Sequence, residues 1–140
     1  MIKLLLWIWQ LPQNIAGFLV VKLARATKQK MFGYEFYTSK LFNSAVSLGN
    51  YIILDSVYLS QPKYYLENTI KHENGHRKQS KILGWFYLLI VGLPSICRNI
   101  YDRIAHKKWD YTKRSNWYYA GFPENWAEKL GETKRYYDKS

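Results

Sequence analysis

Apolar residues are concentrated in two long runs, and the first occupies residues 1–23. A polar patch at residues 10–14 divides this run into two pieces, each too short to cross a bilayer. Trp7 and Trp9 lie in the first piece, and basic residues follow the run (Lys22, Arg25, Lys28 and Lys30). This pattern predicts an interfacial or membrane-anchoring helix with a cytoplasmic downstream flank. A signal peptide fits less well because only one lysine precedes the apolar residues, and an amphipathic helix packed on the core is the alternative.

The second apolar run, Leu83–Cys97, is the most hydrophobic internal segment. Only 16 residues separate Lys81 from Arg98, which is marginally short for a transmembrane helix. Ten Lys or Arg residues fall between residue 22 and Lys81, and ten more lie after the run. A single crossing would therefore leave no positive-inside bias. We expect a buried or membrane-dipping element that returns to the side it left.

A helix is predicted to begin after Pro94, near the end of the second apolar run. Ser95 is a candidate cap, and the spacing places Ile96, Ile100 and Ile104 on one helical face. Cys97 is the only cysteine, so an intramolecular disulfide is excluded. Its apolar surroundings predict a small buried hydrophobic residue.

Residues 33–59 have the composition of β-strands. Gly33–Thr38 is rich in aromatic residues, and Tyr51–Leu54 is a short apolar run. Asn43–Asn50 contains residues typical of a turn. We expect two or three antiparallel strands here.

A long helix is predicted from Pro62 to about Gly84, since proline suits a first helical turn and glycine a C-terminal end. Leu66 and Ile70 mark its inner face, and its lysines are expected to be solvated. Gly75 inside the helix costs about 1 kcal/mol relative to alanine. This cost predicts a packing reason, such as another backbone that approaches closely.

The length of 140 residues suits a single domain, assigned to residues 1–131, with the polar residues 132–140 as a frayed tail. The formal net charge of +11 suits nucleic acid, an anionic membrane surface or acidic substrates. The basic residues are spread along the chain without a zinc-knuckle spacing or an aromatic-glycine RNA signature. Nucleic acid is therefore the less favoured partner.

The pentapeptide His72-Glu73-Asn74-Gly75-His76 carries the most specific chemical information. Two histidines at i and i+4 project from one face of a helix, about one turn apart. That spacing suits two imidazole nitrogens that bind one zinc ion at roughly 2.0–2.1 Å. Glu73 is then the candidate general base for a zinc-activated water. The alternative is an exposed helix that carries these polar residues by accident.

A catalytic zinc needs a third protein ligand and one open position. Glu124 and Glu128 share one face of a short predicted helix that begins after Pro123 and ends at Gly131. Glu124 is the candidate ligand, and Glu128 is the candidate partner that hydrogen-bonds a ligand histidine. A solvated helix face is the alternative for this pair.

With these two motifs, the chain resembles small zinc metallopeptidases of the gluzincin type, in which H-E-x-x-H precedes E-x-x-x-D on a later helix. More narrowly, it resembles small bacterial and phage-type HExxH proteins. The shared blocks stand at Ser47–Leu54, Ile70–His76, Gly92–Ser95 and Glu124–Gly131.

The resemblance implies the zinc ligands His72, His76 and Glu124, with Glu73 as the base. In peptidases of this architecture, the strand before the metal helix lies at the sheet edge and can hold an extended substrate. The family pattern has Asp where this chain has Glu128, and the longer side chain is expected to shift the hydrogen bond to histidine.

The predicted fold is α+β and zincin-like: a small antiparallel sheet on the HExxH helix and a second ligand helix, with apolar N-terminal and central helices. The predicted function is zinc-dependent hydrolysis of peptide or protein substrates. Candidates for supporting the oxyanion are His106, Tyr118 and Tyr119, although a core or exposed position is the simpler interpretation of His106. The alternatives are a non-catalytic, basic, membrane-associated protein with a structural or vestigial metal site, and a binder of an anionic polymer.

Overall fold

The computed structural model describes residues 1–135 and has an α+β fold. Its sheet contains β1 (Thr27–Met31), β2 (Tyr34–Ser39), β3 (Ala45–Leu48) and β4 (Tyr51–Asp55). Its α-helices are α1 (Ile2–Trp9), α2 (Leu11–Leu23), α3 (Lys63–Leu83), α4 (Leu93–Ala105), α5 (Tyr111–Ala120) and α6 (Glu124–Gly131). A 3₁₀ turn (Ser56–Ser60) precedes α3, and a 3₁₀ turn (Gly84–Phe86) and a π-helical turn (Leu88–Gly92) connect α3 to α4.

The sheet is mixed, with the strand order β1-β2-β4-β3. The prediction of two or three antiparallel strands is therefore wrong in number and in direction: β2 and β4 are parallel, with Tyr37 opposite Ile53, and the other two pairs are antiparallel. The missed strand β1 (sequence TKQKM) is mostly polar at an exposed sheet edge, so it lacks the apolar signal of a buried strand.

Strand β3 lies inside the segment predicted to be a turn, residues 43–50. It pairs with β4 through a tight hairpin in which Leu48 faces Tyr51. The loop is reduced to Gly49 and Asn50, and Gly49 has the positive φ of +62° that such a loop requires. Turn residues do flank this strand, but four of the eight positions, residues 45–48, belong to β3 itself.

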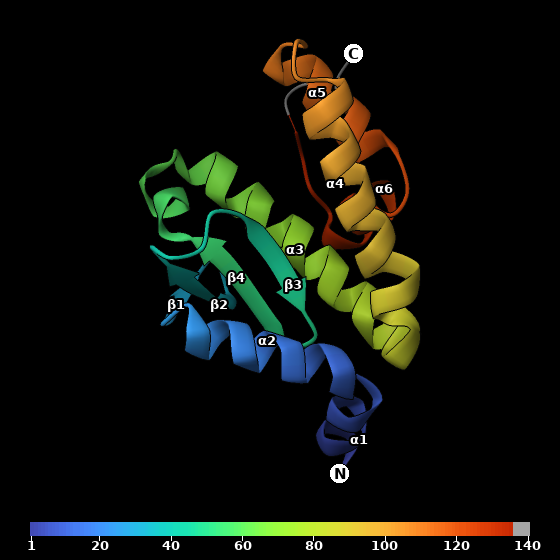
Figure 1. The fold of residues 1–140 in the computed structure, drawn as a ribbon. Coiled ribbons are helices and arrows are strands. Elements are labelled where there is room, and N and C mark those ends of the chain that lie inside the picture. The colour runs from blue at the N-terminus through green and yellow to red at the C-terminus, as the bar shows by residue number, and fades with distance from the viewer. Residues whose placement is uncertain (136–140) are drawn as a thin grey trace.

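Helices cover both faces of the sheet, which Figure 1 shows between α2 and α3. On the α3 face, a buried apolar cluster forms the core (Phe36, Ile52, Leu54, Leu66 and Ile70). On the other face, α2 approaches through Gly17, which lies against Tyr51. The inner face of α3 at Leu66 and Ile70 was predicted from the sequence and is confirmed, as are the ends of this helix at Pro62 and Gly84.

Helix α6 packs against α3 at very short range, and two glycines allow this. A Cβ atom built on Gly75 would overlap the backbone of Ala127, lying within 2.9 Å of the Ala127 Cα. A Cβ on Gly131 would overlap the backbone of Lys71 in the same way. The predicted close approach of another backbone to Gly75 is confirmed.

The chain turns sharply after α3, and the axes of the helical segments before and after the turn differ by 120°. Tyr87 and Val91 are buried in this turn, but Phe86 and Leu89 are exposed. The apolar run Leu83–Cys97 is therefore only partly buried, whereas a buried or membrane-dipping element was expected. Among the described residues, no single helix has the length and hydropathy to cross a membrane, and two bent helix pairs meet those criteria only when joined.

Helix α4 begins earlier than the sequence suggested, at Leu93, so Ser95 lies in its first turn and is not its cap. The isoleucines of α4 share one face as predicted, but that face is exposed (Ile96, Ile100 and Ile104). Cys97 is exposed as well, which contradicts its assignment as a buried residue.

The predicted frayed tail begins with residues that are held in place. The Lys134 backbone N–H donates to Asn68 Oδ1 at 2.8 Å, and the Lys134 carbonyl accepts from Asn68 Nδ2 at 3.0 Å. Lys134 is therefore held against α3, and the start of the predicted tail is not frayed, which is a correction to the prediction. The remainder of the predicted tail, including Tyr136, lies outside the described residues.

Candidate metal centre

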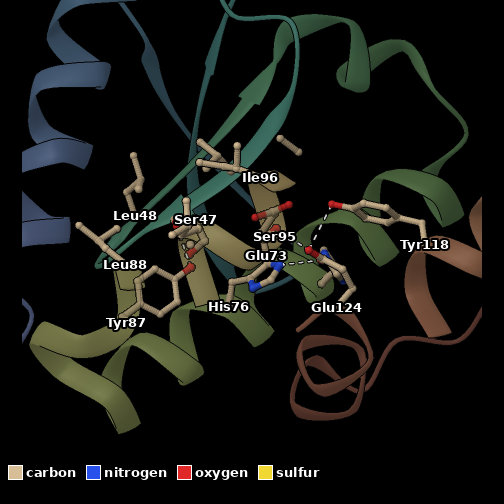
Figure 2. Close-up of a pocket in the computed structure, with 15 residues that line it drawn as sticks. Ser47, Leu48, Glu73, His76, Tyr87, Leu88, Ser95, Ile96, Tyr118 and Glu124 are labelled. Atoms are coloured by element: carbon tan, nitrogen blue, oxygen red, sulfur yellow. Dashed lines mark hydrogen bonds and ion pairs between the residues drawn. The ribbon is translucent and has the colours of Figure 1, made fainter. Parts of the chain in front are cut away.

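A cavity of about 330 Å³ lies between the edge strand β3, helix α3 and the segment that leads into α4 (Figure 2). Apolar side chains from β3 and from residues 88–96 line one part of it. The Tyr87 hydroxyl donates to the Ser47 carbonyl at 3.2 Å and ties this segment to β3. The polar side chains that line the part of the cavity near α6 are those of His72, Glu73, His76, Ser95, Tyr118 and Glu124.

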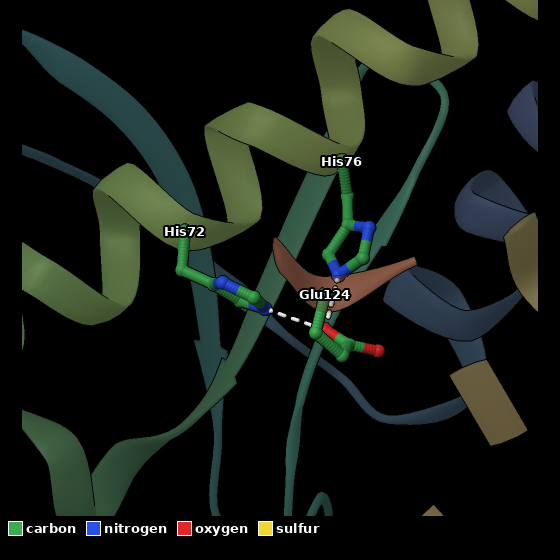
Figure 3. Close-up of side chains that lie close together, drawn as sticks. All are labelled: His72, His76 and Glu124. Atoms are coloured by element: carbon green, nitrogen blue, oxygen red, sulfur yellow. Dashed lines mark hydrogen bonds and ion pairs between the residues drawn. The ribbon is translucent and has the colours of Figure 1, made fainter. Parts of the chain in front are cut away.

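Three of these polar side chains point toward one another (Figure 3). Nε2 of His72 and Nε2 of His76 lie 2.9 Å and 3.0 Å from the same atom, Oε2 of Glu124. All three residues are buried, and their potential ligand atoms lie within 4.8 Å of one another. Two imidazole nitrogens and one carboxylate oxygen are a donor set that holds catalytic zinc. The structure thus brings together the three residues that the sequence proposed as ligands.

Two helices position these ligands. His72 and His76 are one turn apart on α3, so both imidazoles leave the helix on the same side. Glu124 is the first residue of α6, and its carboxylate is fully buried. The glycine contacts between α3 and α6 bring the two helices close enough for the carboxylate to lie between the imidazoles.

The other nitrogen of each histidine also has a partner. Nδ1 of His72 lies 2.7 Å from Glu128 Oε1, and Nδ1 of His76 lies 2.7 Å from Gln79 Oε1. When Nδ1 donates, the lone pair of a neutral imidazole is on Nε2, the nitrogen that faces Glu124. Glu128 makes the contact that its spacing predicted, despite being longer than Asp. Gln79 was missed, although its position three residues after His76 on the same helix was a usable signal.

Glu128 is itself held by the C-terminal segment. Arg135 donates to both of its oxygens, from Nε at 2.8 Å and from Nη2 at 2.9 Å, and Thr133 Oγ1 donates at 2.6 Å. Burial acts to raise the pKa of Glu128, but the hydrogen bonds from His72 and Arg135 lower this pKa to about 2. Glu128 is therefore ionised at neutral pH. Thr133 and Arg135 were not predicted as site residues because they lie in the polar terminal segment, which was expected to be frayed.

Glu73 lies beside the cluster without taking part in it. Its side chain lines the cavity and is buried, and Oε2 has no hydrogen-bond partner among residues 1–135. Burial raises the pKa of this carboxyl group, because the charged form is poorly solvated. A carboxylate with a raised pKa and an unoccupied oxygen is suited to accept a proton.

The second oxygen of Glu124 faces two hydroxyl groups. Oε1 accepts a hydrogen bond from Ser95 Oγ and another from the Tyr118 hydroxyl at 3.2 Å. Burial raises the pKa of Tyr118, so its phenol stays protonated and remains a hydrogen-bond donor at neutral pH. Ser95 was not proposed from the sequence as a site residue.

The other two oxyanion candidates differ in placement. The ring of Tyr119 packs edge-on against the His72 ring, with centroids 5.0 Å apart. His106 belongs to another cluster, where Nδ1 lies 3.1 Å from Asp102 and the ring stacks on Trp109. The structure therefore places His106 as a buried structural residue, as its simpler interpretation predicted.

Zinc binding at pH 7 is expected to release about one proton per chain from the metal-free protein. Burial lowers the pKa of His72, but hydrogen bonds with Glu124 and Glu128 outweigh it and raise this pKa to about 9. Zinc binds only the neutral imidazole, so its apparent affinity should rise with pH up to about 9. Calorimetry in two buffers of different ionisation enthalpy measures the released protons. A value of zero at pH 7 would show that His72 is already neutral.

Comparisons of the chain with family models, with curated proteins and with solved structures find no match. The geometry of the site shows a three-residue group able to hold a metal ion, with Glu73 in the same cavity.

Proposed function

We propose that this protein is a zinc-dependent peptidase with a zincin-like arrangement of sheet, HExxH helix and second ligand helix. The observation that carries the proposal is the convergence of His72 and His76 on the buried Glu124 carboxylate, with the Glu73 carboxyl in the same cavity. Structural zinc sites usually have four protein ligands, whereas catalytic sites have three and an open position. The group found among the described residues has three.

Each residue has a chemical role in this proposal. When bound, zinc supplies a Lewis acid that polarises a carbonyl group and acidifies water. Glu73 accepts the proton from the attacking water and then donates it to the amine nitrogen as the peptide bond breaks. Glu128 and Gln79 fix the orientation of the two histidines through their Nδ1 atoms.

Tyr118 is the candidate for oxyanion support that the geometry favours. It lines the cavity, and its protonated hydroxyl already reaches the carboxylate of Glu124. A hydrogen-bond donor at this position can stabilise negative charge on the carbonyl oxygen of a peptide under attack.

Strand β3 is the proposed support for an extended peptide. It lies at the edge of the sheet and lines the cavity, so a peptide can pair with its outer backbone edge once it displaces the Tyr87 hydroxyl from the Ser47 carbonyl. The expectation that the strand immediately before the metal helix lies at the edge is wrong, because β4 lies between β2 and β3. The edge position belongs to the strand that sequence analysis had assigned to a turn.

Metal analysis tests the site directly. Wild-type protein is expected to bind about one zinc ion per chain, and Glu124→Ala and His72→Ala should each weaken binding by at least about 100-fold. That loss exceeds the roughly 10- to 100-fold typical of removing an outer hydrogen-bond partner. The measurement is zinc affinity by competition with a chelating dye. Glu67→Ala, which removes a half-exposed carboxylate of α3, is the matched control and should leave affinity unchanged.

Unchanged zinc affinity in Glu124→Ala would remove this residue from the site. Peptidase activity is measured separately, by mass spectrometry of a broad peptide library with and without a chelator. A protein that holds zinc but cleaves nothing would favour the non-catalytic alternative.

A further inference from the structure

Two apolar segments leave their side chains uncovered. No residue of α1 is buried, and the turn between α3 and α4 exposes large side chains over residues 85–96. We call these exposed residues of α1 and of 85–96 the apolar surface. Typical members are Leu4, Leu5, Trp7, Phe86, Leu89 and Ile96, with exposed fractions of 62%, 60%, 39%, 60%, 65% and 60%.

The two segments meet in the fold, although about 75 residues separate them in the chain. The Trp85 indole N–H donates to the Ile8 carbonyl at 2.9 Å, and the Trp9 indole N–H donates to the Lys81 carbonyl at 3.0 Å. A buried hydrogen bond from Gln13 to Ser80, 2.9 Å long, fastens the start of α2 to the end of α3. Figure 1 shows α1 beside the turn that follows α3. The two segments of the apolar surface are therefore adjacent and are fixed to the body of the protein.

Both segments lie in stretches of chain without acidic residues. Residues 1–34 contain five Lys or Arg and no Asp or Glu, and residues 74–101 contain four Lys or Arg and no Asp or Glu. Lys3 and Lys81 are exposed within or next to the apolar surface. An uncovered apolar area with basic residues around it matches the interface of an anionic bilayer.

We propose that the apolar surface docks this protein on an anionic lipid bilayer, with α1 and residues 85–96 at the level of the headgroups. Trp7, Trp9 and Trp85 suit that level, where aromatic residues are enriched. The sharp bends after α1 and after α3, of 84° and 120°, suit helices that lie in the interface plane. A second copy of the chain fits this surface less well, because each copy carries a net charge of +11.

The docked orientation has a consequence for the cavity. Leu93 and Ile96 belong both to the apolar surface and to the lining of the cavity. Docking therefore places the cavity next to the bilayer, where it faces peptide segments close to a membrane. This statement about substrates rests on the proposed peptidase function, whereas docking itself does not.

Sedimentation with lipid vesicles tests the docking. The full-length Glu73→Gln variant is used, so that the result does not depend on peptidase activity. It should pellet with vesicles of phosphatidylcholine and phosphatidylglycerol, and binding should be about tenfold or more weaker on phosphatidylcholine alone or at high salt. The added double substitution Leu5→Gln/Leu89→Gln should weaken binding by about tenfold or more, since it removes one exposed leucine from each segment.

The matched control is Leu41→Gln/Val57→Gln, which replaces exposed apolar residues outside the apolar surface and should leave binding unchanged. Equal losses in both double variants would overturn the proposal. It would also be overturned by a protein that ignores anionic vesicles, or by a dimer that dissociates when Leu5 and Leu89 are replaced. Circular dichroism and thermal unfolding establish that the variants are folded.

A second measurement needs no substitution in the apolar surface. Cys97 is the only cysteine, is exposed, and lies on α4 beside Ile96. A nitroxide attached to Cys97 should become more accessible to oxygen and less accessible to a water-soluble nickel complex when anionic vesicles are added. Unchanged accessibilities in vesicle-bound protein would show that another surface makes the contact.

Discussion

Replacing Glu73 with glutamine is expected to lower the peptidase rate by about 10²- to 10⁴-fold and to leave zinc affinity and the fold unchanged. The amide has almost the same shape as the carboxyl group, but it cannot accept the proton from the attacking water. Glu73 is also outside the ligand cluster, and its Oε2 has no hydrogen bond to lose among the described residues. Burial raises the pKa of the Glu73 carboxyl, so neutralising this residue should not destabilise the fold.

The rate is measured as kcat/KM on the best substrate found in the peptide library, with zinc content and thermal unfolding measured on the same samples. Glu67→Gln is the matched control, because Glu67 is on the same helix but is half-exposed and paired with Lys71 at 3.0 Å. It should retain wild-type activity. A zinc-loaded Glu73→Gln variant with wild-type activity would exclude Glu73 as the general base.

The candidate site could be predicted from the sequence to the extent that it depends on helical spacing. His72 and His76 lie one turn apart on α3, and Glu124 and Glu128 lie one turn apart on α6. The spacing within each pair can therefore be inferred from the sequence of a single helix. The two pairs face each other only because of tertiary packing. This arrangement depends on the contact between α3 and α6, which the sequence indicated only through the close packing predicted at Gly75, while Gly131 had been interpreted as a helix end.

The parts that escaped prediction depend on contacts with another element, even where that element is close in the chain. Thr133 and Arg135 look like residues of a polar terminus until α6 places them beside Glu128. Strand β3 is short and has turn residues on both sides, so only its pairing with β4 identifies it. The spacing of apolar residues within one helix or strand identifies its apolar face. It does not indicate whether another helix or strand covers that face.

The isoleucine face of α4 shows this limit most clearly. Ile96, Ile100 and Ile104 recur with helical spacing, which normally indicates a face packed on the core. In the structure this face is exposed. The same periodicity therefore suits burial in protein or contact with another apolar phase, and the sequence alone does not distinguish the two.

Replacing Gly75 with alanine is expected to destabilise the protein by about 1–3 kcal/mol, even though alanine favours a helix by about 1 kcal/mol. The added methyl group would overlap the backbone of Ala127, and a backbone cannot rotate away as a flexible side chain can. Relief requires α6 to move away from α3. Because Ala127 lies between Glu124 and Glu128 on α6, that movement also draws both carboxylates away from the histidines. Zinc affinity should therefore fall by about tenfold or more.

Urea unfolding of the metal-free protein and zinc competition measure the two effects. Gly92→Ala is the matched control, because the nearest atom that its Cβ would meet is Leu88 Cδ2 at 3.5 Å, an ordinary contact. This control should be as stable as the wild type or slightly more stable. If Gly75→Ala were equally stable and bound zinc normally, α3 and α6 would not be in close contact in solution. The meeting of His72 and His76 with Glu124 depends on that contact, so the proposed zinc site would fall with it.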